Sequence, residues 1–173
     1  LVTFGVVPIE PNTGFGSLHR GGRLRPGSRA HQVLEFVEKP SAEVARQYLD
    51  SGEYWWNSGM FVWRAATLLD CLSQLKPQTR HHVDELVADP SRLAEVYPCM
   101  EKVSVDIAVM EPASHGGCGV HVAAIPLEIQ WYDVGSYEAL APHLPSDGVG
   151  NNASGLTAVS YTHLRAHETS LHL

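Results

Sequence analysis

The sequence is poor in cysteine and in basic residues, and it has no long hydrophobic run. Its 173 residues include three cysteines without C-x-x-C spacing, which argues against a disulfide framework and favours reduced thiols in the cytosol. No apolar run approaches the ~20 residues that a membrane span needs. Twelve Lys and Arg against nineteen Asp and Glu give a formal net charge of -7, which disfavours a general nucleic-acid surface. We therefore expect a cytoplasmic protein whose partners are small molecules, with no nucleic acid and no membrane among them.

Groups for metal or nucleophilic chemistry are also scarce. His81 and His82, and the loop from His115 to Cys118, do not match a standard zinc-ligand spacing, so we expect them at the surface. No Ser/His/Asp or Cys/His arrangement suited to nucleophilic catalysis is apparent. The three cysteines are interpreted as buried, reduced thiols.

Strand-like and helix-like segments alternate along the chain. Apolar, β-rich stretches predict strands over 1–9, 15–19, 31–38, 59–63, 120–126 and 129–134. Helices are expected over 41–50 and 64–75, between the prolines at 77 and 90, over 92–97, and from residue 136. Ser41 and Gly52 are suitable caps for the first of these helices. The alternation predicts an α/β domain with a mostly parallel sheet.

Five segments mix glycine, proline or polar residues into apolar sequence: FGVVPIEPNTGFG, FVEKP, WNSGMF, SVDIAVME and WYDVGSY. Such segments suit loops that hold a small polar ligand at the end of a sheet. The Glu38 carboxylate accepts hydrogen bonds from hydroxyl groups, and the Lys39 ammonium matches a phosphate as a point charge. Taken alone, this pair fits an exposed ion pair at a strand end equally well.

Other residues in these segments have both a ligand-binding and a structural interpretation. Gly16 permits a close backbone approach to a ligand, or simply forms a turn. Asn57 lies among aromatic residues and needs hydrogen-bond partners, or it forms an Asn-Ser-Gly turn. Asp133, at an expected strand end, suits Mg²⁺ or caps a helix. Asp106 either lines the same pocket or is structural, and Glu111 is interpreted as structural.

In this order and spacing, the five segments resemble the sugar-binding half of the mannose-1-phosphate guanylyltransferases, over roughly 1–140. The resemblance implies a Rossmann-like, mixed but mostly parallel sheet flanked by helices, incomplete at the N-terminus. It assigns substrate binding to Gly16, Glu38, Lys39 and Asn57, with Lys39 at the sugar phosphate. The family has Tyr where Phe15 stands, so a hydroxyl contact is lost there.

The same resemblance implies the chemistry. Mannose 1-phosphate and GTP would give GDP-mannose and pyrophosphate, with Mg²⁺ as cofactor. Lys39 and Asp133 would be the catalytic residues, and Asp133 a Mg²⁺ ligand. A different hexose or base, or a non-catalytic sugar-nucleotide-binding module, remains an alternative, as does a homo-oligomer.

The two ends of the chain have unusual sequences. Leu1 opens within a strand-like run, so we expect a fragment truncated at its N-terminus and inactive by itself. Residues 1–145 are interpreted as the sugar-binding half of the catalytic domain and 146–158 as a linker. Residues 159–173, beginning VSYTHLRAHET after Ala158, resemble a translated sequencing adapter and are expected to be a non-native tail.

Overall fold

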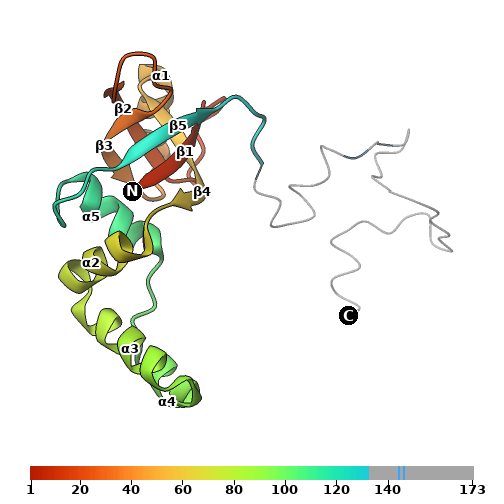
Figure 1. The fold of residues 1–173 in the computed structure, drawn as a ribbon. Coiled ribbons are helices and arrows are strands. Elements are labelled where there is room, and N and C mark those ends of the chain that lie inside the picture. The colour runs from red at the N-terminus through yellow and green to blue at the C-terminus, as the bar shows by residue number, and fades with distance from the viewer. Residues whose placement is uncertain (133–143, 145, 147–173) are drawn as a thin grey trace, which may run out of the picture. The chain divides into compact units, whose positions relative to one another are not determined.

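The computed structural model describes residues 1–132, 144 and 146 (Figure 1). Residues Leu1–Trp131 form one compact unit. The strands are β1 (Val2–Val6), β2 (Ser17–Arg23), β3 (His31–Val37), β4 (Tyr54–Val62) and β5 (Ala123–Leu127). The α-helices are α1 (Ala42–Ser51), α2 (Ala65–Leu75), α3 (Pro77–Ala88), α4 (Leu93–Val96) and α5 (Glu111–Ser114). A π-helix, η3 (Asp106–Met110), precedes α5 directly. The α/β class is thus confirmed.

The five strands close into a barrel in the order β1, β4, β2, β3, β5. β1 pairs parallel with β5, and the other pairs among the described strands are antiparallel. The expectation of a mostly parallel sheet was therefore wrong. Helix α1 does connect two parallel strands, β3 and β4, but β2 lies between them and is antiparallel to both. Alternation of strands and helices predicts crossovers, but it does not reveal a strand inserted between the connected pair.

Apolar side chains from the strands and from η3 and α5 make one core. Leu18, Phe36, Val109 and Met110 are fully buried in it. Leu68, Leu72 and Leu75 of α2 pack against the same core. Burying a side chain of this size contributes about 1.5–3 kcal/mol. The core therefore joins the barrel to the helices that follow β4.

Both ends of helix α1 are capped as the sequence predicts. The Ser41 hydroxyl accepts a hydrogen bond from the Val44 N–H, so one of the free donors at the helix start is satisfied. Gly52 follows the last turn with φ 67°, a left-handed conformation that glycine adopts without a Cβ clash.

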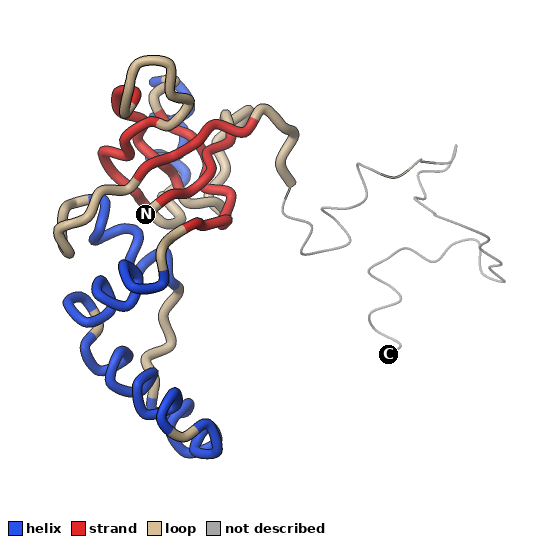
Figure 2. The backbone as a smooth tube through the Cα atoms, in the orientation of Figure 1, coloured by secondary structure: helices blue, strands red, loops and turns tan. Residues whose placement is uncertain are grey.

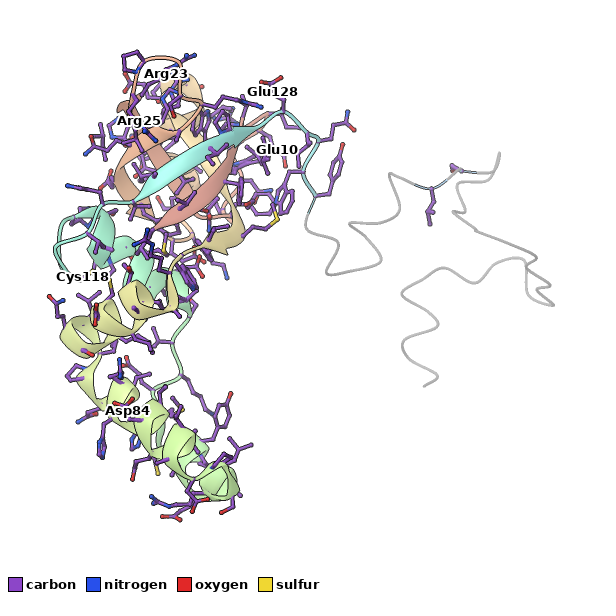
Figure 3. All side chains as sticks on the ribbon, viewed as in Figure 1. Glu10, Arg23, Arg25, Asp84, Cys118 and Glu128 are labelled. Carbon is purple, nitrogen blue, oxygen red and sulfur yellow. The ribbon has the colours of Figure 1, made fainter. Side chains whose placement is uncertain are left out.

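Several strand bounds differ from expectation. β2 continues to Arg23, beyond the strand predicted over 15–19, and Figure 3 shows Arg23 and Arg25 near its turn into β3. The buried part of β4 is residues 55–58 and not 59–63, because the strand starts earlier and its later residues are largely exposed. Residues 129–132 form no strand. The rest of that predicted strand and the helix from Ser136 lie outside the described residues.

Helices α2, α3 and α4, which we call the helical arm, extend from one end of the barrel (Figure 2). Each α-helix of the arm starts near the residue that the sequence predicted, and proline opens α3, where its missing N–H costs nothing. In the described part of the chain, no helix is long and apolar enough to cross a bilayer.

Candidate functional site

Gly16 directly precedes β2 and lies between two polar side chains. A Cβ at this position would be 2.7 Å from Oε2 of Glu38 and 3.4 Å from Cβ of Asn57. Real Cβ atoms essentially never approach within 3.0 Å, so only glycine leaves the carboxylate where it is. The Gly16 carbonyl also accepts a hydrogen bond of 2.7 Å from the Asn57 N–H. The barrel thus brings together three residues that lie far apart in the sequence, each from a different motif.

Asn57 is buried in β4 and links two other side chains. Its Oδ1 accepts a hydrogen bond of 2.8 Å from the Thr3 hydroxyl, and its Nδ2 donates to Oδ1 of Asp106 at 3.1 Å. An amide side chain has two donors and two acceptor sites, so one N–H and one lone pair remain. These two bonds fix the amide orientation.

The π-helix η3 brings a second and a third carboxylate toward Glu38. The Glu111 N–H donates to the Asp106 carbonyl, which is the i→i+5 bond of a π-turn. This bond stacks Asp106 and Glu111 one turn apart, whereas an α-helix would place residues five apart on different sides. Both carboxylates act electrostatically on Glu38. Asp106 therefore belongs to the same cluster, and Glu111, interpreted as purely structural, lies within electrostatic reach of it.

The Glu38 carboxyl is held in an environment that disfavours its charge. Its side chain is 16% exposed. Burial raises the pKa of Glu38 above its ordinary value, and the Asp106 and Glu111 carboxylates raise it further, while Lys39 opposes them. A partly desolvated carboxylate is a strong acceptor that gains from hydrogen-bond donors such as sugar hydroxyls.

Lys39 has a strained backbone and an exposed side chain. Its φ is 47°, and it is the one non-glycine residue with positive φ in the described range. Such strain costs on the order of 1–3 kcal/mol and gathers at ligand-binding sites. The Nζ lies 4.0 Å from Oε1 of Glu38, and the side chain is 66% exposed. The ammonium therefore stands at the open side of the cluster.

Asp133 lies outside the described residues, so its position relative to the cluster is not described. Among the described residues no group of three or more His, Cys, Asp or Glu could hold a metal ion. His81 and His82 instead approach the Glu85 carboxylate at 3.8 and 3.0 Å.

Thr3 is a site residue that the sequence analysis missed. It is fully buried in β1, and its hydroxyl is within hydrogen-bond distance of both Asn57 Oδ1 and the Met60 carbonyl. A threonine in a strand is ordinary, so no local signal identified it. Only the pairing of β1 with β4 places Thr3 beside Asn57.

The structure also locates the cysteines and Phe15. Cys71 and Cys118 are free and buried, as expected, with their sulfurs 2.8 Å apart. The burial of Cys118 contradicts the expectation that the loop from His115 to Cys118 lies wholly at the surface. Cys99 is exposed, contrary to expectation, at the end of the short 3₁₀ helix Tyr97–Cys99 that follows α4. The Phe15 ring packs against Trp56 at 5.0 Å between centroids.

Comparison with known proteins identifies the family. The profile of the family described as Nucleotidyl transferase matches residues 1–145. The mannose-1-phosphate guanylyltransferases of Escherichia coli and Klebsiella pneumoniae are each 38% identical over 163 residues, covering 90% of this chain and 33% of theirs. The xanthan biosynthesis protein XanB of Xanthomonas campestris is 38% identical over 162 residues, covering 90% of this chain and 32% of that protein. The chain thus spans about a third of the length of these curated relatives.

Two solved structures are also similar to this chain. A Thermus thermophilus crystal structure, described as a mannose-1-phosphate geranyltransferase, matches with a TM-score of 0.70 and 33% identity. The match covers 82% of this chain and 39% of that one. A Helicobacter pylori structure described as a mannose-6-phosphate isomerase matches with a TM-score of 0.59 and 28% identity, over 76% of this chain and 51% of that one. With the family profile covering most of its length, the chain belongs to the nucleotidyl transferase family.

Proposed function

We propose that this chain is the sugar-phosphate-binding part of an enzyme that transfers a guanylyl group from GTP to mannose 1-phosphate. The products are GDP-mannose and pyrophosphate. The observation that carries the proposal is the convergence of Gly16, Glu38 and Asn57 at one point of the barrel, in a chain of this family. Relatives named mannose-1-phosphate guanylyltransferases, at about 38% identity, support the choice of mannose and GTP.

The chemistry of the cluster suits a hexose. Glu38 offers acceptor oxygens, and Asn57 keeps one N–H and one lone pair, so a ring bearing several hydroxyls has both kinds of partner. Gly16 keeps the space between them free of a side chain. Thr3 and Asp106 hold the Asn57 amide in a single orientation, which lowers the entropy lost when a sugar binds.

Lys39 is the residue that we assign to the phosphate of the sugar. Its exposed ammonium stands next to Glu38, so a sugar held by Glu38 has its charged end within reach of Lys39. In the reaction, an oxygen of this phosphate forms a bond to the α-phosphorus of GTP while the bond to pyrophosphate breaks. Lys39 then acts by position and charge, holding the attacking phosphate in line.

Mg²⁺ is the proposed cofactor, and Asp133 is the residue that we expect to hold it. When bound, the ion neutralises charge on the phosphates. Among the described residues, Glu38 and Asp106 have the hard oxygen atoms that Mg²⁺ prefers, but one Asp106 oxygen already accepts a bond from Asn57. Mg²⁺ is usually held by one or two carboxylates together with substrate phosphates, so the assignment of Asp133 requires no closed cage of protein ligands. The cysteine usage remains the ground for placing the protein in the cytoplasm.

A binding titration tests the sugar-phosphate assignment on the chain itself. We expect mannose 1-phosphate to bind, and Lys39→Ala and Glu38→Gln each to weaken binding by roughly tenfold or more, the effect of losing one charge-assisted contact. Arg46→Ala, which removes an exposed cation from α1, is the matched control and should bind as the parent does. Unchanged binding in both site variants would refute the assignment.

The transfer reaction needs a separate measurement. Pyrophosphate release from GTP is followed in a protein that contains this sequence, with mannose 1-phosphate and Mg²⁺ present. We expect release to require both substrates and to fall in Lys39→Ala and Asp133→Asn. A protein that binds mannose 1-phosphate but releases no pyrophosphate from GTP or another nucleoside triphosphate would support the non-catalytic alternative.

A further inference from the structure

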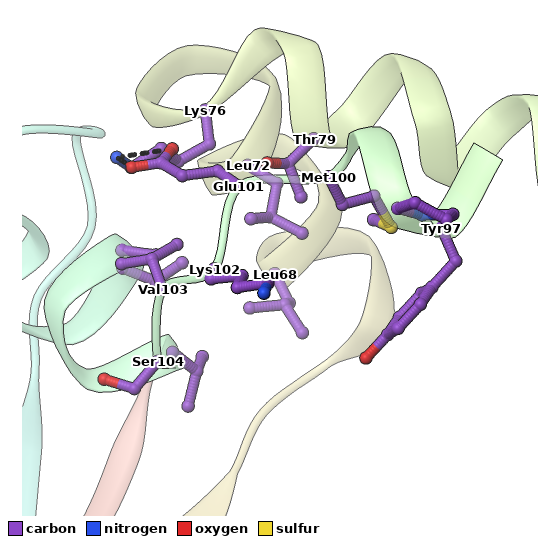
Figure 4. A pocket seen from close by; sticks show the side chains of 14 residues that line it. Leu68, Leu72, Lys76, Thr79, Tyr97, Met100, Glu101, Lys102, Val103 and Ser104 are labelled. Carbon is purple, nitrogen blue, oxygen red and sulfur yellow. Dashed lines mark hydrogen bonds and ion pairs between the residues drawn. The ribbon is translucent and has the colours of Figure 1, made fainter.

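A cavity of about 650 Å³ lies between α2, the start of α3 and the segment 97–109 (Figure 4). Pockets that bind small molecules have volumes of roughly 300–1,000 Å³ and mostly apolar walls. We call this space the arm cavity. Its apolar lining includes Leu68, Leu72, Val103, Val105, Ala108 and Val109. None of the residues assigned to the sugar site lines it, so it is a separate site.

Three charged residues line the arm cavity and determine the sign of its net charge. Nζ of Lys76 lies 2.9 Å from both carboxylate oxygens of Glu101, so these two charges compensate each other. Lys102 also lines the cavity, and Figure 4 draws it among the apolar side chains. Two lysines and one glutamate leave one net positive charge beside an apolar wall. A ligand that complements this lining is apolar over most of its surface and carries one negative group.

The π-helix η3 is common to the arm cavity and the sugar site. Ala108 and Val109 of η3 line the cavity. Asp106, the first residue of the same helix, accepts the hydrogen bond from Asn57. π-turns are rare and occur frequently at functional sites. A ligand that contacts Ala108 and Val109 therefore acts on the element that holds Asp106 in place.

We propose that the arm cavity binds a small amphipathic monoanion, and that its occupancy is transmitted through η3 to Asp106 and Asn57. The apolar part of the ligand packs on Leu68, Leu72 and the η3 residues, and its anionic group pairs with Lys102. The volume of about 650 Å³ lies within the range of pockets that take a single small molecule. This inference is independent of which sugar or nucleotide the other site takes.

Decanoate is a suitable probe, because it has an alkyl chain and one carboxylate. We expect it to displace anilinonaphthalene sulfonate from the 173-residue chain, and decyltrimethylammonium, its cationic counterpart, to bind at least about tenfold more weakly. Lys102→Glu should weaken decanoate binding about tenfold or more, whereas Lys102→Arg should retain it. Arg46→Glu, the same charge change on an exposed position of α1, should leave binding unchanged.

A second variant tests the cavity without changing its charge. Thr79 lines the arm cavity from α3, so Thr79→Trp should fill part of it and abolish decanoate binding. Circular dichroism of each variant checks that the helices remain. Equal binding of decanoate and decyltrimethylammonium, or decanoate binding that survives both Lys102→Glu and Thr79→Trp, would overturn the proposed site.

The link through η3 has its own readout. The side-chain amide resonances of Asn57 report on its hydrogen bond to Asp106, and heteronuclear NMR follows them during a decanoate titration. We expect these resonances to shift in proportion to occupancy in the parent and to stay unchanged in Thr79→Trp. Decanoate binding without any shift at Asn57 would refute the transmission through η3. Neither measurement uses mannose 1-phosphate or GTP, so the proposed function is tested separately.

Discussion

The barrel and the helical arm hold their polar groups in different ways. The buried polar side chains of the described residues, Thr3, Ser17, Asn57 and Ser58, all lie on barrel strands. Helix α3 of the arm buries none of its twelve residues, and its charged side chains form ion pairs at the surface, such as Arg80 with Asp84. Buried polar groups are costly unless each has its partner. The barrel therefore constrains its polar residues tightly, while α3 of the arm tolerates change, and mutations should separate the two regions.

The largest difference is expected for core truncation. Phe36→Ala should lower the free energy of unfolding by about 3–5 kcal/mol, because Phe36 is fully buried in the barrel core and its removal leaves a cavity. Val87→Ala on α3 is the matched truncation in the arm, where the side chain is 77% exposed, and should change stability by less than about 0.5 kcal/mol. Urea unfolding of both variants measures the contrast. Similar losses in the two would show that the arm is as constrained as the barrel.

The next effect concerns the hydrogen bond that holds Asn57. Thr3→Val has nearly the same shape but no hydroxyl, so Asn57 Oδ1 loses its buried donor. We expect a loss of about 1–3 kcal/mol in unfolding free energy. Thr3→Ser keeps the hydroxyl and should retain most of this stability. If Thr3→Val and Thr3→Ser were equally destabilising, the loss of unfolding free energy would come from packing and not from the hydrogen bond.

A smaller and functional effect is expected at Gly16. Gly16→Ala places a methyl group 2.7 Å from the Glu38 carboxylate, which must move. We expect mannose 1-phosphate binding to weaken by roughly tenfold, about 1.4 kcal/mol, while the fold is kept. Gly22→Ala, on β2, the strand that directly follows Gly16, and with nothing within 4 Å of the new methyl, is the control. Calorimetric titration of both variants distinguishes a local effect at the site from a general effect on β2.

The barrel site should also show a pH dependence. The native pKa of Glu38 is raised, so the folded chain binds this proton more tightly than the unfolded chain does. The stability that this carboxyl contributes is therefore present below its unfolded pKa, about 4.3, and is lost as pH rises through the native pKa. Glu38→Gln has no such proton. Its stability relative to the parent should thus rise between about pH 4 and about pH 7. Urea unfolding at both pH values checks the direction of this change in stability, and an opposite trend would refute the raised pKa of Glu38.

The smallest effect is expected at an arm ion pair. Arg80→Ala removes a pair whose atoms lie 2.9 Å apart but on an exposed helix surface. Solvent and salt screen such pairs, so the urea midpoint should not move measurably. The double variant with Asp84→Ala provides the cycle that isolates the pair. A clear coupling would mean that the arm depends on its surface charges.

The helices were largely predictable because their signals are local. The Ser41 cap, the Gly52 end of α1 and the proline that opens α3 each act within one turn of sequence. Gly16, Glu38 and Asn57 were also identified, because glycine or polar residues within apolar segments stand out at the level of sequence. The resemblance implied that these three residues converge, and the barrel does bring them together. The roles assigned to them, and that of Asp133, remain predictions.

The failures share a different cause. Strand direction depends on which strands are neighbours, and no local pattern announced that β2 would lie between β3 and β4. The predicted start of β4 was wrong because residues 55 and 56 pair with β1 and β2, which are distant in the sequence. The segment around Trp55 and Trp56 does not reveal these partners. Cys99 was predicted to be buried from its residue type, but it is exposed in the 3₁₀ helix that follows α4.

By itself, the sequence determined the α/β class, the helices with their caps, and the polar residues of the candidate site. These follow from interactions between residues close together in the chain, or from residue types that are unusual in their surroundings. The tertiary structure alone decided the closed, mainly antiparallel barrel, the bond from Thr3 to Asn57, and the π-turn that aligns Asp106 with Glu111. Each of these depends on packing between distant segments or on a departure from the α-helical period, and short-range sequence patterns carry neither.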